Sequence, residues 1–256
     1  MSVWLDGMGL EDISPRVKIK TIEPGAPAMT LKTADNAKYS GVRFLMQKEG
    51  SRTVKITFRI LEADEQRREN IFSDILAWAH GSRLELADRP GLYLPVLCTA
   101  FPVMKNQRDY SADLTMNFTA FNPAWRAMVP TTTTLKTTAG VSASAYIQPP
   151  GTEDATFLEF EVKNTSSGTM NTAAVTVNGR SFSFTGLGLA SGGTLAVKYD
   201  DDGLLSIVTL GGVSKLHCRT AQSDDDLLLY QCKPNKVAVT TATVADVKLI
   251  GRGRYR

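Results

Sequence analysis

The sequence predicts a mainly β protein, with an N-terminal β-sandwich that carries one helix and a second, jelly-roll-like β-sandwich at the C-terminus. Two observations support this fold class. Apolar and polar residues alternate in many short runs, which is typical of half-buried strands. Turn residues interrupt these runs about every 8–12 residues, as in sandwiches. The chain has 256 residues, enough for one large β domain or two modest ones.

The first half opens with an alternating strand at residues 16–22. Residues 23–50 are weakly patterned after Pro24 and Gly25, and we interpret them as an extended arm or a loose hairpin. Residues 54–60 then alternate apolar and polar side chains more clearly than any other run. Further strands are expected at Leu84–Leu86, Tyr93–Cys98 and 112–120, with a turn at Asp88–Gly91.

One helix is expected at about residues 64–80. Asp64 is placed to accept a hydrogen bond from a free N–H of the first turn. Apolar residues recur at helical spacing on one face. Gly81 is expected to end the helix in a left-handed conformation. His80 would then lie in the last turn, where its charge favours the helix carbonyls; we expect no catalytic role, because no partner group is marked.

A domain boundary is expected at about residue 130, which gives domains 1–130 and 131–256. Pro130 and the run Thr131–Thr134 resemble a tether more than a core strand. The second half then shows short alternating strands between glycine-rich turns. Asn178–Gly179 between Val175–Val177 and Phe182–Phe184 predicts a tight hairpin. A second hairpin is expected at Asp200–Gly203, between Leu195–Tyr199 and Leu205–Ile207, and closing strands at Val237–Val239 and Val247–Leu249.

The composition excludes some classes of function. A formal net charge of +3 gives no reason to expect nucleic-acid binding. The arginines at the C-terminus, Arg252, Arg254 and Arg256, are interpreted as the solvated side of a last strand. The N-terminal residues lack a basic region followed by an apolar run, so no secretory signal is expected. No apolar stretch approaches the ~20 residues that span a bilayer. We therefore expect folding in a cytoplasm.

The residue types that carry chemistry form no recognised site. Cys98, Cys218 and Cys232 lack the spacing of a zinc site, and a Cys218–Cys232 bridge is possible but not implied. His217 and Cys218 are neighbours, which on a strand would point to opposite faces and form no dyad. Gly186, Gly188 and Gly192 do not match the dinucleotide-binding pattern and are expected to connect strands.

The clustered carboxylates favour turns over metal sites. Asp200–Asp202 ends in Gly203, as a hairpin turn would, and Asp224–Asp226 is expected to be a solvated loop; calcium binding is the alternative for both. Glu159 and Glu161 alternate on a strand and are expected to form its solvated face. We therefore predict no catalytic, cofactor-binding or metal-binding residues, and no enzyme activity.

Several short motifs occur in a fixed order along the chain. In the first half these are Pro15–Thr21, Arg52–Ile60, Ala79–Gly81, Leu86–Val96 and Phe121–Trp125. In the second half they are Val175–Phe182, Leu189–Leu195, Asp201–Leu205 and Gly251–Arg256. In this order, the motifs resemble the distal tail protein family of siphophages and related prophages. The resemblance covers most of the chain, and the order of the motifs carries more weight than any single one.

The resemblance implies a structural hub at the tail tip of a virion, assembled in the host cytoplasm. A hexameric ring of N-terminal domains would join the tail tube protein to the tail-tip protein, with no cofactor. A galectin-like or carbohydrate-module-like second domain would point outward, toward a receptor-binding protein or a host cell-wall saccharide. The arm at 23–50 is our candidate for contacting the neighbouring subunit. The last strand either stays in the second domain or returns to the first.

Two other functions stay open. A stand-alone lectin-like protein is the main alternative, although the aromatic residues that usually stack on sugars are scarce in the second half, which has no Trp and the tyrosines Tyr146, Tyr199, Tyr230 and Tyr255. A glycoside-active enzyme is the third possibility. No pair of acid and base carboxylates is marked for it, and such a pair is recognised by its separation in space, which the sequence does not give.

Overall fold

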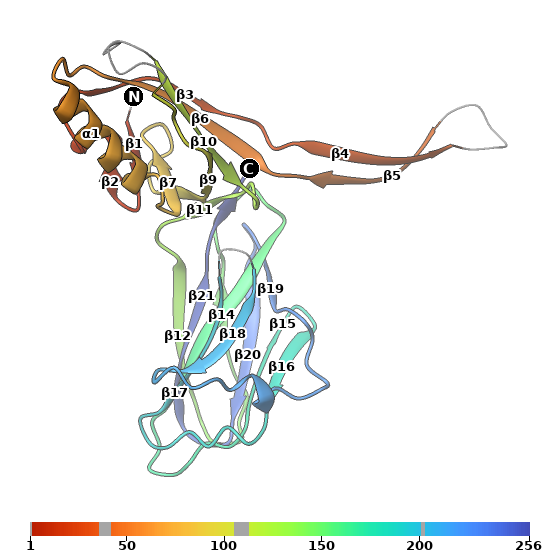
Figure 1. Cartoon of the computed structure of the whole chain (residues 1–256). Helices are drawn as coiled ribbons and strands as arrows, with labels where there is room; N and C mark the ends of the chain where they lie inside the picture. The colour runs from red at the N-terminus through yellow and green to blue at the C-terminus, as the bar shows by residue number, and fades with distance from the viewer. Residues whose placement is uncertain (1, 36–41, 105–112, 201–202) are drawn as a thin grey trace. The chain divides into compact units, whose positions relative to one another are not determined.

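The computed structural model describes residues 2–35, 42–104, 113–200 and 203–256 (Figure 1). This part of the chain is mainly β with one α-helix, which confirms the predicted fold class. The chain divides into two compact units, Met1–Trp125 (unit 1) and Arg126–Arg256 (unit 2). Within the described ranges no helix is both long and apolar enough to cross a membrane.

The first sheet of unit 1 is a four-stranded antiparallel sheet. Its strands, in spatial order, are β3 (Val17–Pro24), β6 (Arg52–Ile60), β10 (Leu114–Ala120) and β9 (Leu97–Ala100). The alternation of β6 and β10 predicted from sequence is confirmed, because every second residue of both strands is buried. Val54, Ile56 and Phe58 are fully buried and form the middle of this core.

The second sheet of unit 1 is built from shorter strands, which the sequence pattern only partly indicated. Its order begins β2-β1-β7-β8, with β1 at Val3–Leu5, β2 at Met8–Gly9, β7 at Arg83–Leu86 and β8 at Leu92–Pro95. The single strand expected at Tyr93–Cys98 is wrong. Val96 interrupts it, and β8 and β9 belong to different sheets.

Helix α1 spans Glu65–Trp78. The Asp64 carboxylate accepts a hydrogen bond from the Arg67 N–H at 2.8 Å, as predicted. The buried face includes Ile75 and Trp78, and the Trp78 ring meets the Phe118 ring edge-on at 6.0 Å between centroids. The prediction for Gly81 is wrong, because its φ is not positive. Glycine is needed there for space: a Cβ would lie 2.5 Å from Leu5 Cγ.

The predicted arm contains a two-stranded antiparallel hairpin. Strand β4 (Met29–Asp35) pairs with β5 (Val42–Glu49), from Met29–Glu49 to Asp35–Val42. The pair forms a sheet of its own, separate from the two sheets above. The hairpin form of the prediction is therefore correct, and the connection at 36–41 lies outside the described residues.

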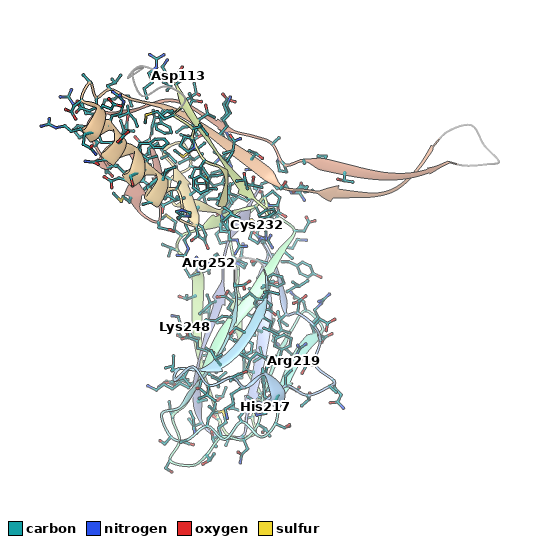
Figure 2. All side chains as sticks on the ribbon, viewed as in Figure 1. Asp113, His217, Arg219, Cys232, Lys248 and Arg252 are labelled. Atoms are coloured by element: carbon teal, nitrogen blue, oxygen red, sulfur yellow. The ribbon has the colours of Figure 1, made fainter. Side chains whose placement is uncertain are left out.

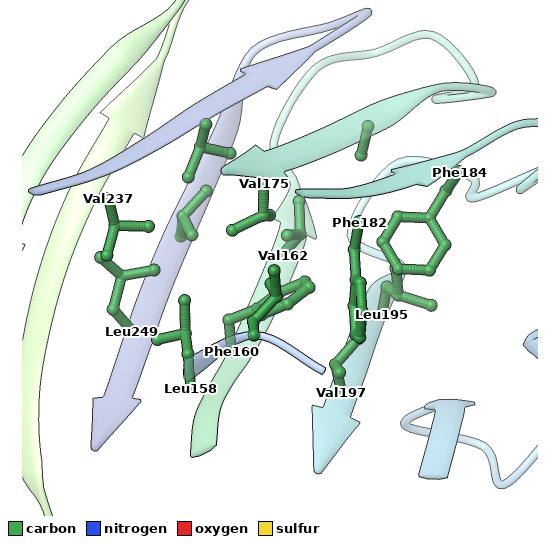
Figure 3. Packing of buried hydrophobic residues seen from close by; sticks show 14 of the residues in the cluster. Leu158, Phe160, Val162, Val175, Phe182, Phe184, Leu195, Val197, Val237 and Leu249 are labelled. Carbon is green, nitrogen blue, oxygen red and sulfur yellow. The ribbon is translucent and has the colours of Figure 1, made fainter. Parts of the chain in front are cut away.

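Unit 2 is a β-sandwich around one apolar core. One sheet has the order β12-β21-β14-β17-β18, with β19 pairing on β14, and the other has the order β13-β20-β15-β16. The strands are β12 (Thr131–Thr137), β13 (Ala143–Ile147), β14 (Ala155–Asn164), β15 (Ala173–Val177), β16 (Arg180–Phe184), β17 (Thr194–Tyr199), β18 (Leu205–Thr209), β19 (Leu228–Tyr230), β20 (Asn235–Thr241) and β21 (Ala245–Gly251). Figure 3 shows Phe160, Val175 and Phe182 from the two sheets packed together.

Both predicted hairpins of unit 2 are present. Asn178 and Gly179 have φ values of 51° and 79°, the left-handed pair that a tight turn between β15 and β16 requires. Strands β17 and β18 pair from Leu195–Thr209 to Tyr199–Leu205. Asp201 and Asp202 of the connecting turn lie outside the described residues.

The tether predicted at Thr131–Thr134 is wrong. These residues begin β12, an edge strand that pairs with β21 from Thr131–Gly251 to Thr137–Ala245. A run of identical residues has no alternation to reveal a strand, although threonine is β-branched and suits one. The chain passes between the units in β11 (Trp125–Ala127), and within unit 2 the Ala127 N–H donates to the Gly253 carbonyl at 2.9 Å.

Candidate interaction surfaces

Two edge strands of the unit 2 sandwich, β18 and β16, are covered by a later segment of the chain. Residues 212–226, here called the covering segment, run along two edge strands. On β18, the Thr209 N–H donates to the Val213 carbonyl at 2.9 Å. On β16, the Thr220 N–H donates to the Ser183 carbonyl at 2.8 Å. Exposed strand edges are templates for association, so this segment removes two of them from unit 2.

Side chains hold the covering segment on β16. The Asp224 carboxylate accepts a hydrogen bond from the Ser181 N–H at 2.6 Å, and the Ser223 hydroxyl accepts one from the Ser183 N–H at 2.9 Å. The guanidinium of Arg219 lies over the Phe182 ring. The prediction that Asp224–Asp226 form a solvated loop is therefore wrong for Asp224. Among the described residues no group of three or more His, Cys, Asp or Glu is placed to hold a metal ion.

His217 and Cys218 do not form a dyad, although for a different reason than the one expected. They lie in a 3-10 helix, Leu216–Cys218, and not on a strand. His217 is exposed, whereas Cys218 is buried and its thiol donates to the Gly186 carbonyl at 3.4 Å. Cys232, labelled in Figure 2, is exposed, and none of the three cysteines is in a disulfide. His80 is also exposed, and its ring lies 5.2 Å from that of Phe101.

Glu159 and Glu161 differ from the solvated pair expected. The Glu159 carboxylate is half-buried and accepts a hydrogen bond from the Tyr199 N–H at 3.3 Å. Burial raises the pKa of Glu159, and the backbone hydrogen bond and nearby cations oppose that rise only in part. Glu161 is paired with Lys198 at 3.4 Å. Both carboxylates therefore have structural contacts within the sheet.

A groove lies on the outer face of the six-stranded sheet of unit 2. It has a volume of about 570 Å³ and is lined by charged and hydroxyl side chains with one exposed leucine. The polar lining side chains are Thr134, Lys136, Glu161, Lys163, Thr194, Asp246 and Lys248. Lys248 is labelled in Figure 2. None of the lining residues is aromatic, so the groove offers hydrogen bonds but no stacking surface for a sugar ring.

The C-terminal arginines are not a solvated row, which corrects the prediction for two of the three. Arg252 is half-buried and donates to the carbonyls of Ala127 and Met128 at 2.8 and 3.1 Å. Burial lowers the pKa of the half-buried Arg254. Arg256 is exposed and forms an ion pair with Glu153 at 3.3 Å. Arg252 and Arg256 thus contact other residues of unit 2.

The four-stranded sheet of unit 1 has two edges of different character. Strand β9 forms one edge, and Leu97, Phe101 and Val103 in or beside it are 57%, 39% and 69% exposed. Strand β3 forms the other edge. There the Ile19 N–H donates to the Glu11 carboxylate at 3.3 Å. The sequence pattern did not reveal β9 as an edge, because the order of strands depends on pairings between distant residues.

The face of this sheet that turns away from the core is polar. The Thr99 and Thr119 hydroxyls are 2.8 Å apart, and the Thr57 and Thr115 hydroxyls are 3.4 Å apart. Asp113, labelled in Figure 2, pairs with Arg59 and with Lys20. The hydrogen bond from Arg59, more than any other contact, lowers the pKa of this exposed carboxyl. The face thus carries small hydroxyls and mutually paired charges.

The similarity of this fold to solved structures extends over nearly the whole chain. The Dit protein of phage SPP1, described as a hub of the adsorption apparatus in phages that infect Gram-positive bacteria, matches with a TM-score of 0.71 and 14% identity over 98% of both chains. The chain has the distal tail protein fold. The predicted resemblance is thereby confirmed at the level of the fold.

Two baseplate structures extend this comparison. The phage p2 baseplate in its activated conformation with strontium matches with a TM-score of 0.58 and 6% identity, over 98% of this chain and 96% of the other. The form with calcium matches with a TM-score of 0.55 and 5% identity, over 93% and 90%. No protein-family model matches the chain, and no curated protein matches it either.

Proposed function

We propose that this chain is a non-enzymatic structural hub of a phage tail tip. Six copies would form a ring that joins the tail tube protein to the tail-tip protein, in the virion after assembly in the host cytoplasm. The observation that carries the proposal is the distal tail protein fold over 98% of the chain, shared with a phage hub protein. The paired charges and small net charge fit a part that joins other proteins mechanically.

Ring closure is assigned to the edges of the β3-β6-β10-β9 sheet. Neighbouring strands of this sheet are antiparallel, so β3 and β9 run in opposite directions. A β9 edge that meets the β3 edge of the next copy would therefore continue the antiparallel alternation. Two different surfaces that meet in this way form a heterologous interface, which closes into a ring when the rotation allows it.

The β4–β5 hairpin is assigned a role in contacting the neighbouring subunit. A two-stranded hairpin alone is marginally stable in water, and this one joins neither of the larger sheets of unit 1. Contact with another subunit would supply the missing packing. Replacing residues 29–49 with a short Gly-Ser linker should abolish or weaken the ring. Intact rings from this variant would remove the hairpin from the interface.

The proposed function is tested by adding the purified chain to assembled tail tubes of the same phage. Electron microscopy should show a ring seated at one end of each tube, and the variant in which a Gly-Ser linker replaces residues 29–49 should show fewer seated rings. Failure of the full chain to bind tubes, with rings present in solution, would contradict the joining function.

A lectin-like function of unit 2 is the second candidate, and the groove of about 570 Å³ favours it. Its lysines, carboxylates and threonines match the donors and acceptors of sugar hydroxyls, whereas the lack of aromatic lining weighs against it. The test is binding of the full chain to an array of cell-wall glycans. Loss of binding in Lys248→Ala would place a sugar in this groove. If the full chain binds no glycan of the array, the lectin-like function is contradicted.

A further inference from the structure

The two edges of the four-stranded sheet of unit 1 carry an apolar projection and an apolar hollow. The hollow lies at the β3 edge, between the two sheets. It has a volume of about 170 Å³ and is lined by Ser2, Ile22, Pro24, Leu86, Ala87 and Asp88. A cavity of about 150 Å³ holds a benzene molecule, so the hollow matches one aromatic or large aliphatic side chain in size.

The projection at the opposite edge is the Phe101 side chain, just beyond β9. Phe101 is 39% exposed as a residue, and its ring contacts the His80 ring just after helix α1. The same helix packs on the buried face of the sheet through Trp78 and Phe118. Phe101 therefore lies on the helix side of the sheet, at its open end. Leu97 is exposed on the other face, where its pairing partner is Thr119.

The hollow lies on that same helix side. Pro24 and Ile22 pair with Val54 and Ile56, whose side chains are fully buried in the core of unit 1. Side chains of paired residues point to the same face of a sheet, so Ile22 and Pro24 border the gap between the sheets. Phe101 and the hollow thus both lie on the helix side of the four-stranded sheet, at its two opposite edges.

The register also places the two features at the same height. One row of paired residues crosses the whole sheet from Cys98 through Phe118 and Val54 to Pro24. Ala100 pairs with Asn117, so Phe101, the next residue, lies at the height of Met116, which is also the height of Ile22 through Ile56. Copies in a closed ring are related by rotation without a shift along the ring axis, so features at equal height meet when the strands run along that axis, as the proposed edge-to-edge ring requires.

We infer that the Phe101 side chain of one copy fills the hollow between Ile22, Pro24 and Leu86 of the next copy. This inference rests on the proposed ring and assigns its interface an anchor. The occupant is a second copy of this chain because the two features are complementary in polarity and size and lie at equal height on opposite edges. An aromatic ring that enters a fitted pocket is the usual form of an interface hot spot.

Disulfide cross-linking tests the inference directly. Phe101→Cys and Pro24→Cys are introduced together in a Cys232→Ser background, which removes the exposed native thiol. Within one copy the two edge strands are separated by roughly 14 Å, three strand spacings, which is beyond the reach of a disulfide. Oxidation is therefore expected to link copies into a ladder that ends at six. The matched control, Leu97→Cys with Pro24→Cys, should give no ladder, because Leu97 lies on the other face.

Each outcome of the experiment decides a different claim. Assembled rings without the Phe101–Pro24 ladder, or an equal ladder from the Leu97 control, would overturn the inference and leave the ring intact. Absence of any assembly in the unmodified chain would overturn the proposed ring itself. A second variant, Phe101→Ala, should weaken self-association by about 30-fold or more, as loss of a hot spot does, while Leu97→Ala changes it little. Equal melting temperatures of both variants would show that folding is retained.

Discussion

The guanidinium of Arg219 lies over the ring of Phe182, with 4.5 Å between the guanidinium carbon and the ring centroid. This contact joins the covering segment to β16, and the same guanidinium donates to the Asp224 carbonyl. Arg219 therefore contacts both the strand beneath the segment and the segment's own backbone. Stability at a covered strand edge can be tested at this position.

Arg219→Ala should destabilise unit 2 by about 1–2 kcal/mol, because it removes a cation–π contact and a hydrogen bond. Hydrogen exchange of the backbone amides in 213–226 should accelerate, because the covering segment separates from β16 more often. Exchange mass spectrometry and urea unfolding measure the two effects. Lys236→Ala, an exposed position on β20, is the control and should change little. Unchanged exchange in 213–226 would show that Arg219 does not hold the segment.

Gly179→Ala should destabilise the chain by about 1 kcal/mol. Gly179 has a φ of 79° in the turn between β15 and β16, a conformation that disfavours a Cβ although open space surrounds the position. Gly168→Ala is a matched control, because that glycine also faces open space but its φ is not positive. The control should be neutral or slightly stabilising. Equal melting temperatures for the two variants would contradict a strained-turn account.

Asp64→Ala should cost about 1 kcal/mol, because the carboxylate accepts the hydrogen bond from the Arg67 N–H at the start of α1. Thermal unfolding followed by circular dichroism measures the loss. Asp64→Asn is the matched control, since an asparagine oxygen accepts the same hydrogen bond and should retain most of the stability. Equal losses from alanine and asparagine would assign the effect to charge and not to capping.

Glu159 gives a pH-dependent prediction. Burial raises the pKa of Glu159 in the folded chain, so this carboxyl ionises at lower pH in the unfolded chain than in the folded one. The contribution of Glu159 to stability therefore falls as the pH rises from its unfolded-state pKa to its folded-state pKa. Glu159→Gln removes the buried charge and keeps an oxygen for the Tyr199 N–H. The variant should be more stable than the original chain at pH 7, by about 0.5 kcal/mol because solvent screens a half-buried group.

That gain should disappear below about pH 4, where Glu159 is protonated in both states. Melting temperatures measured from pH 3 to pH 8 provide the check. Glu161→Gln is the control; it breaks the ion pair with Lys198 and should show no such gain. A difference in melting temperature between Glu159→Gln and the original chain that is the same at every pH would show that ionisation of Glu159 does not cause the effect.

Local patterns were sufficient to predict most strands, the hairpin at Asn178–Gly179 and the start of α1 at Asp64. Each depends on residues close together in the chain, such as alternation along β6 or a left-handed pair in a turn. The alternation of apolar and polar residues gave no signal for β12, which begins with four threonines. The prediction from local sequence also failed for Gly81, whose requirement comes from contact with Leu5, 76 residues away in sequence.

The interaction surfaces could not be predicted in this way. The residues of the covering segment that contact β16 are about forty positions away from it in sequence. No local signal marks Ser223 or Asp224 as the residues that hold the segment on β16. Phe101 was unremarkable in sequence, because a single exposed apolar residue has meaning only when the strand order places it at an edge. The order of strands and their register supply that information.

The mass of the purified full-length chain in solution tests the central claim most directly. Light scattering over a range of concentrations, with negative-stain images of the same sample, should give the mass of six copies and an annular particle. The account depends on strand edges of one copy meeting those of the next. A chain that remains a single copy at high concentration, with no annulus in the images, would contradict it.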